Sequence, residues 1–204
     1  MSAQVLSVSL PSEIIYVSGT VNGTAYTWTL IGGAWTATVE RAADDTYDVA
    51  LTAVTAAGVS ANYALTLYYG LLSLITDRTR ADVANQTDKG FYNASDLNRV
   101  GAAVEYIAGR FTALGYACPV TVKKDWLTTD APTASQMEAY RQNIVTLRGQ
   151  IAVMASTPNA PASMAGLNYV RANNIEQILL DLDALIDNLI KSWYFSGEVY
   201  AGEV

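Results

Sequence analysis

The hydrophobic pattern of the chain changes within residues 61–80, which read ANYALTLYYGLLSLITDRTR. Up to Gly70 the apolar residues alternate with polar ones in steps of two, as in β-strands, and Arg41 is the only basic residue. Beyond it lie the other eleven of the twelve Lys and Arg residues, and apolar residues recur at steps of three and four. This change of period predicts two folding units, a β unit over residues 1–70 and a helical unit over residues 71–204.

Short runs of alternating residues fill the first unit, and each run ends in turn-forming residues. Asn22-Gly23 and Gly32-Gly33 can supply the positive φ angles that a two-residue hairpin requires. Trp28 and Leu30 would share one face of the third run. The runs predict strands over residues 4–10, 14–21, 24–31, 34–40, 47–55 and 60–69. Short strands separated by regular turn signals are typical of a β-sandwich or a small barrel.

One strand of this unit carries a resemblance to a known module. Residues 44–58, DDTYDVALTAVTAAG, resemble the penultimate strand and the following turn of bacterial immunoglobulin-like modules. The resemblance implies that Tyr47 forms a tyrosine corner, in which its hydroxyl hydrogen-bonds to the backbone a few residues upstream. A plain aromatic strand residue is the alternative. Asp44, Asp45 and Asp48 could ligate Ca²⁺, but acidic turn residues more often bond to their own backbone.

Three amphipathic helices are predicted in the second unit. Ser95 is expected to cap the first helix, which Gly115 ends. Thr133 opens a capping box before the second helix, whose apolar stripe runs to Ile151. Asn168 is expected to cap the third. Three helices joined by short links predict a small bundle, so the fold class is α+β, with an immunoglobulin-like β-sandwich followed by this bundle and an extended C-terminal tail.

The last eleven residues, YFSGEVYAGEV, contain two glycines and alternating aromatic residues, a pattern that is not typical of a helix. They predict an extended strand or a tight hairpin. This segment either folds over its own bundle or adds as a strand to the edge of a neighbouring subunit. Apolar residues beyond a finished helix have little core left to fill, so we expect an assembly interface at Trp193, Tyr194, Phe195, Glu198 and Tyr200.

The composition excludes several kinds of chemistry. The chain has no His, which removes Ser-His-Asp catalysis and every His-ligated metal site. Its one cysteine, Cys118, has no basic partner in sequence and is expected to be a small buried residue. Asp181, Asp183 and Asp187 lack the glycine bend of an EF-hand loop and are expected on the solvated side of the third helix. We therefore expect no catalytic residue, no cofactor and no metal.

The charge and the N-terminus bear on partners and location. The net charge is −7, and no basic run exists beyond Lys123-Lys124, so nucleic-acid binding is not expected. The sequence contains no run of about 18 apolar residues, so no membrane span is predicted. The N-terminal residues do not form a signal peptide, so synthesis in the cytoplasm is expected.

Four segments of the second half resemble a known class of protein. They are LITDRT at 74–79, YNASDLNRV at 92–100, NNIEQILLD at 173–181 and SWYFSGE at 192–198. Spread over most of residues 74–204, they resemble a domain found in tail-region structural proteins of phages and prophages of Gram-positive gut bacteria. The chain differs in having a short stretch between Val83 and Tyr92, where relatives carry a longer insertion.

This resemblance implies a non-enzymatic virion structural protein of the phage tail or baseplate, which assembles through its helical domain and presents the immunoglobulin-like domain. The expected partners are other virion proteins and copies of the chain itself, in a symmetric assembly. One alternative is a capsid decoration protein. Another is a carbohydrate-binding adhesin at the tail tip with a host-surface glycan as partner. The candidate sugar-stacking residues, most of which should be core, are Tyr16, Tyr26, Trp28, Trp35 and Tyr63.

Overall fold

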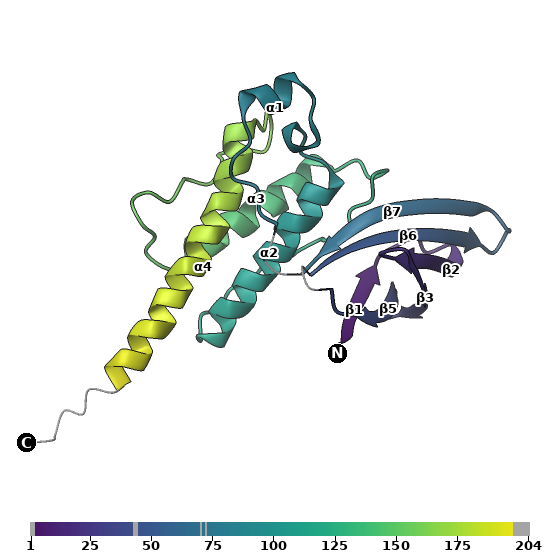
Figure 1. Ribbon diagram of the computed structural model, residues 1–204, viewed down its shortest axis with the longest axis horizontal. Coiled ribbons are helices and arrows are strands. Elements are labelled where there is room, and N and C mark those ends of the chain that lie inside the picture. The colour runs from purple at the N-terminus through teal and green to yellow at the C-terminus, as the bar shows by residue number, and fades with distance from the viewer. Residues whose placement is uncertain (1–2, 43–44, 70, 72, 198–204) are drawn as a thin grey trace, which may run out of the picture. The chain divides into compact units, whose positions relative to one another are not determined.

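The structure is a computed structural model that describes residues 3–42, 45–69, 71 and 73–197. Strands come first and helices follow, which confirms the predicted α+β class (Figure 1). The chain folds as two compact units that each combine separate segments. The first unit consists of Met1–Ser73, Phe91–Ala102 and Lys123–Pro132, and the second of Leu74–Gly90, Ala103–Val122 and Thr133–Val204.

The expected division at residue 70 would put all later residues into the helical unit. The observed first unit, however, also contains two segments from the second half of the chain. Phe91–Ala102 and Lys123–Pro132 lie in the half that the sequence assigns to helices, yet their contacts belong with the strands. Leu127 joins the strand core, and the Asn98 side chain donates a hydrogen bond to the Thr66 carbonyl. The spacing of apolar residues along the chain does not predict such contacts, because they join residues that are far apart in sequence.

Two antiparallel sheets form the body of the first unit. The three-stranded sheet has the order β1-β5-β4 and the four-stranded sheet the order β3-β2-β6-β7. The strands of the smaller sheet are β1 (Ala3–Val8), β4 (Thr29–Ile31) and β5 (Ala34–Glu40). Those of the larger sheet are β2 (Ile14–Val21), β3 (Thr24–Thr27), β6 (Thr46–Thr55) and β7 (Ser60–Tyr68).

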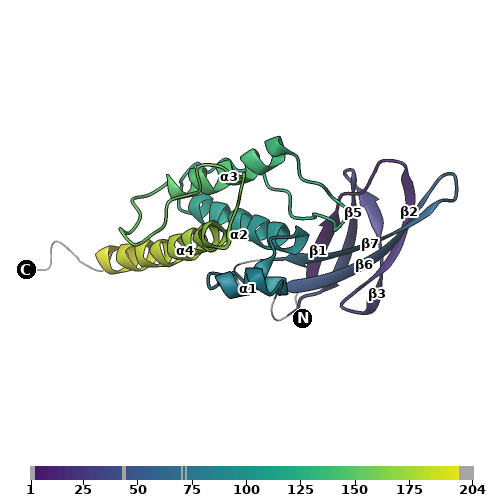
Figure 2. The same ribbon diagram turned by 90° about the horizontal axis from the view of Figure 1, so that it is seen from above.

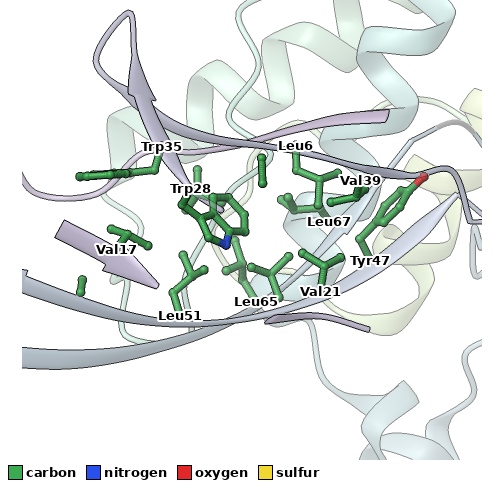
Figure 3. Packing of buried hydrophobic residues seen from close by; sticks show 14 of the residues in the cluster. Leu6, Val17, Val21, Trp28, Trp35, Val39, Tyr47, Leu51, Leu65 and Leu67 are labelled. Atoms are coloured by element: carbon green, nitrogen blue, oxygen red, sulfur yellow. The ribbon is translucent and has the colours of Figure 1, made fainter. Parts of the chain in front are cut away.

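Side chains from both sheets meet in one buried cluster (Figure 3). Leu6 and Trp35 come from the smaller sheet, and Val17, Leu51 and Leu65 from the larger one. Along β6 every second residue is buried from its second position to its eighth, as the alternation predicts. Because successive strand residues point to opposite sides, the intervening residues of β6 form the outer face of the larger sheet.

The predicted single strand over residues 24–31 is wrong. It is divided at Trp28 into β3 and β4, which belong to different sheets. Trp28 is buried, whereas Leu30, predicted to share its face, is 53% exposed. The chain passes from one sheet to the other at Trp28, so the two-residue alternation does not continue across it. The hairpin turn before β3 is as predicted, with φ angles of 48° at Asn22 and 78° at Gly23.

Helices make up most of the second unit, and the N-terminal part of one helix, α2, belongs to the first unit. The helices of the described residues are α1 (Arg80–Ala84), the 3₁₀ turn η1 (Asp88–Gly90), α2 (Ala94–Ala113), α3 (Ala134–Arg148) and α4 (Tyr169–Gly197). The predicted capping box is present at Thr133, and the Asn168 side chain accepts the Arg171 N–H at 3.0 Å. The helices α3 and α4 contact each other, as Figures 1 and 2 show.

Two predicted helix boundaries are wrong. Ser95 does not cap α2, because the helix begins at Ala94 and the Asn93 side chain accepts the Ser95 N–H at 2.9 Å. Asn and Ser are both good capping residues, so the sequence alone did not separate them. The second helix ends at Arg148, and Ile151 lies beyond it.

The predicted extended tail is wrong over Tyr194–Gly197, which continues α4 as a helix. Extending an existing helix by one residue does not require a new nucleation step. Residues with a poor helix propensity can therefore be helical when they directly follow a stable helix. The remainder of the predicted strand or hairpin, residues 198–204, lies outside the described residues.

Candidate functional site

The predicted assembly residues lie at the C-terminal end of the chain. Trp193, Tyr194 and Phe195 have a helical backbone in the last turns of α4. Glu198 and Tyr200 lie outside the described residues. The structure therefore places three of the five predicted residues on one helical segment, although Tyr194 and Phe195 were predicted to lie in the strand or hairpin.

Helix α4 extends beyond its own buried side chains. Ile186 is its last buried residue among the side chains that are described. The next apolar positions, Leu189 and Ile190, are half-buried. The helix continues from residue 187 to Gly197, a length of about 16 Å at 1.5 Å per residue. Figure 1 shows this end of α4 running past the ends of α2 and α3.

Two of the segments that carry the phage-protein resemblance meet in a buried ion pair. The Arg78 Nη2 donates to Glu176 Oε1 at 2.7 Å, and the two side chains are 1% and 0% exposed. The second carboxylate oxygen accepts the Ile75 N–H at 2.6 Å, and Arg78 Nη1 donates to the Ile75 carbonyl at 2.8 Å. The pair thus holds residues 75–78 against α4 and satisfies polar backbone groups there.

Asn173 strengthens the same junction. Its Oδ1 accepts the Arg78 N–H at 3.1 Å, and its Nδ2 donates to the Arg78 carbonyl at 2.9 Å. The amide therefore bonds both backbone groups of one residue, as a neighbouring strand would. We call Ile75, Arg78, Asn173 and Glu176 the α4 junction. Sequence reasoning matched these residues by resemblance but did not predict their contacts.

A third resemblance segment is also used for packing. Asn98 is completely buried, and its Nδ2 donates to the carbonyls of Thr66 at 3.1 Å and of Trp126 at 3.0 Å. Its Oδ1 accepts the Trp126 N–H at 2.6 Å. Next to it, Arg99 forms a buried ion pair with Asp96. These bonds fix residues 123–132 beside β7 and the start of α2.

Asp125 anchors the other side of the same segment. Its carboxylate accepts the Ser9 N–H at 2.5 Å and an Lys123 Nζ hydrogen bond at 2.9 Å. Burial alone would raise the pKa of Asp125, but the hydrogen bonds from Lys123 and Ser9 outweigh it and hold the pKa below the usual value. The segment is thus tied to the end of β1 as well as to β7.

A hollow of about 510 Å³ lies within the first unit, on the outer face of the larger sheet. Its floor is formed by Thr20, Ala50 and Ala64, and its walls by residues 93–95 at the start of α2 and by Trp126 and Thr128. We call this space the sheet hollow. A second space of about 480 Å³ shares the floor and Thr128 and continues along the sheet. No sequence motif pointed to either.

The sheet hollow has one charged wall residue and one unusual donor. Asp48 Oδ1 accepts a hydrogen bond from Thr66 Oγ1 at 2.9 Å. Trp126 is only 4% exposed, and its Nε1 has no acceptor among the described residues. A buried N–H without a partner costs about 1–3 kcal/mol.

The predicted sugar-stacking residues do not form an exposed platform. Trp28 and Trp35 are buried in the sandwich core, and Tyr26 and Tyr63 pack against it. Tyr16 is 58% exposed. Trp28 and Trp35 are therefore core residues, as expected, and Tyr26 and Tyr63 are partly buried against that core.

The acidic residues considered as metal ligands have other partners. Arg110 bonds Asp183 and also Asp187, the latter at 2.6 Å, and this hydrogen bond lowers the pKa of Asp187. Asp181 accepts the Gln177 amide at 2.7 Å. Within the described ranges, no cluster of three His, Cys, Asp or Glu side chains could hold a metal ion.

The acidic turn and the lone thiol are likewise accounted for. Asp45 pairs with Arg41 at 2.7 Å, while Asp44 lies outside the described residues. Cys118 is half-buried, and burial raises the pKa of its thiol, which lowers the fraction of reactive thiolate.

No known protein family, curated protein or solved structure matches this chain. Across the part of the chain that the structure describes, no helix combines the length and apolar character needed to cross a bilayer.

Proposed function

We propose that the chain is a non-enzymatic structural protein of a phage virion, a tail or baseplate component that assembles through its helical half and presents an immunoglobulin-like domain. The observation that carries the proposal is the end of α4, which continues beyond its last described buried side chain and bears Trp193, Tyr194 and Phe195. Aromatic residues are enriched at the centres of protein interfaces, so this helical end suits contact with another chain.

The strand order supports an immunoglobulin-like first domain. With β1, β5 and β4 as strands B, E and D, the larger sheet supplies strands C′, C, F and G as β3, β2, β6 and β7. Strand A has no counterpart among the described strands. Tyr47 then stands near the start of strand F, and its hydroxyl accepts the Ala42 N–H at 3.0 Å. This bond to the backbone five residues upstream is the contact that a tyrosine corner makes.

The α4 junction supports the resemblance to phage tail-region proteins. Arg78 and Glu176 belong to two matched segments that are 98 positions apart, and each is nearly inaccessible to solvent. Residues that hold a scaffold together are expected to be shared by proteins with that scaffold. A helical assembly domain of common architecture accounts for matched segments that contain packing residues.

The proposed location is tested by mass spectrometry of purified particles from the phage or induced prophage that encodes the chain. The proposal expects the protein in the particles at a stoichiometry consistent with a symmetric structural part. Its absence from intact particles would refute the proposal. Antibody labelling of the particles then separates the tail or baseplate from the head, where a capsid decoration protein would be found.

The proposed assembly surface is tested by light scattering of the purified full chain. Phe195→Glu places a charge in the last turns of α4 and is expected to reduce the oligomer to smaller species, because burying an unpaired charge at an interface is costly. Val170→Glu is the matched control, since Val170 is exposed in the first turn of the same helix. Equal oligomer masses for both variants and the unmodified chain would contradict assembly through this end.

A further inference from the structure

We propose that the sheet hollow is a binding site for a neutral, hydroxyl-rich ligand with the chemistry of one or two sugar rings. Its volume of about 510 Å³ lies within the range of about 300–1,000 Å³ that small-molecule sites commonly occupy. This site differs from the surface-aromatic platform considered from the sequence, because it is bounded by two chain segments that approach the sheet from its outer side.

The floor of the hollow is open because small residues occupy it. Ala50 pairs with Ala64 on β7 and with Thr20 on β2, so these side chains form one row across three strands. The row faces outward, since the alternate β6 residues Val49 and Leu51 are buried in the core. Short side chains along the row leave room for a ring to lie against the sheet.

The walls are held in place before any ligand binds. Asn98 bonds the backbone of Trp126 on both its N–H and its carbonyl, and it also bonds the Thr66 carbonyl on β7. The start of α2 is capped by Asn93, whose side chain accepts the Ser95 N–H. A site whose walls are fixed by buried hydrogen bonds loses little conformational entropy when a ligand enters.

The charge of the lining disfavours an anionic ligand. Asp48 is the one ionisable residue among the lining residues, and no Lys or Arg lines the space within the described part of the chain. An anion would meet a carboxylate without a compensating cation, which is unfavourable. Hydroxyl groups, by contrast, can donate to Asp48 and can both donate to and accept from Thr20 and Thr128.

Trp126 lies in the wall of the hollow and can report on a ligand that binds there. Its indole N–H has no acceptor among the described residues, although the residue is almost fully buried in the wall of the hollow. Trp28 Nε1 likewise has no acceptor among the described residues, but Trp28 belongs to the sandwich core and does not line the hollow.

These two tryptophans give the test a built-in comparison. The full chain is labelled with ¹⁵N, and the indole N–H resonance of Trp126 is identified by its loss in Trp126→Phe. Glucose, galactose, N-acetylglucosamine and rhamnose are then titrated separately to about 20 mM, because single-ring ligands often bind with a Kd on the order of 1 mM. Inorganic phosphate serves as the charged probe. At least one sugar should move the Trp126 resonance saturably and leave the Trp28 resonance in place.

A variant pair locates the binding. Ala64→Phe fills the exposed floor and is expected to weaken the sugar affinity by about tenfold or more, which corresponds to about 1.4 kcal/mol. Thr38→Phe adds the same ring to an exposed position of β5 in the other sheet and should leave the affinity unchanged. Both folds are checked by the backbone amide spectrum, and a variant that loses the native spectrum is replaced by Ala50→Leu.

Two results would overturn the assignment. The first is that no sugar moves the Trp126 resonance, or that phosphate moves it while the sugars do not. The second is a sugar response that survives both floor-filling variants, Ala64→Phe and Ala50→Leu. Ligand binding here would be independent of a role in a virion, since a chain that is absent from particles could still bind sugar. The particle experiment and this titration can therefore fail separately.

Discussion

The buried Arg78–Glu176 pair allows a quantitative test of how the second unit is held together. We consider Glu176→Gln, Arg78→Met and the double variant. Each single change leaves one charge without its partner at a site where the two side chains are 1% and 0% exposed. Removing one partner of a buried ion pair costs about 3–5 kcal/mol, because the remaining charge is neither solvated nor compensated.

The double variant should cost much less than the two single changes together. It contains neither charge, and the amide oxygen introduced at position 176 can still accept the Ile75 N–H that the carboxylate binds. The double variant still loses the bond from Arg78 to the Ile75 carbonyl, with a cost of about 1–3 kcal/mol if that carbonyl stays unpaired. The cycle should therefore show a coupling of several kcal/mol between the two residues.

Urea unfolding followed by far-ultraviolet circular dichroism measures these free energies, provided that the helical transition is cooperative. Glu138→Gln is the control, because Glu138 pairs with Arg141 on the surface of α3 and its loss should hardly move the midpoint. Single variants that each cost less than about 1 kcal/mol, or a double variant that costs the sum of both, would refute this account of the pair.

Three further changes test contacts in the first unit. Tyr47→Phe removes the oxygen that accepts a partly buried backbone N–H and should lower the free energy of unfolding by about 1 kcal/mol, whereas Tyr16→Phe, at an exposed phenol, should not. Asn98→Ala should cost about 3 kcal/mol in urea unfolding and speed tryptic cleavage within residues 123–132, because it removes the bonds that hold this segment. Asp125 has a folded pKa below its unfolded value of about 3.9, so its contribution is present above about pH 4 and is lost as the pH falls through the folded pKa. Asp125→Asn should therefore lower the Tm near pH 7 and reduce the further loss of Tm on acidification; an unchanged pH dependence would contradict this.

Local features of the fold were predictable from the sequence. The turn at Asn22-Gly23, the capping box at Thr133 and the cap at Asn168 are all present. Each depends on residues within a few positions of one another, so the physical cause and the signal occupy the same short window. The buried alternation of β6 was predictable for the same reason, since a strand that covers a core places every second side chain inside.

Predictions failed where the chain path overrides a local pattern. Residues 24–31 have the alternation of a single strand, but the chain crosses from one sheet to the other at the buried Trp28. Tyr194–Gly197 read as extended, yet α4 continues through them. Local preference is worth a fraction of a kcal/mol per residue, so tertiary contacts and the preceding helix can outweigh it.

The sequence by itself determined the α+β class, several turns and helix caps, and the exclusion of histidine chemistry. These follow from composition and from period, which are properties of short windows. Only the tertiary structure decided that Arg78 meets Glu176, that Asn98 holds Trp126 against β7, and that a hollow opens over the larger sheet. The first of these contacts joins residues 98 positions apart and the second joins residues 28 positions apart. A sequence pattern that spans three or four residues contains no information on which distant segment lies beside it in the folded chain.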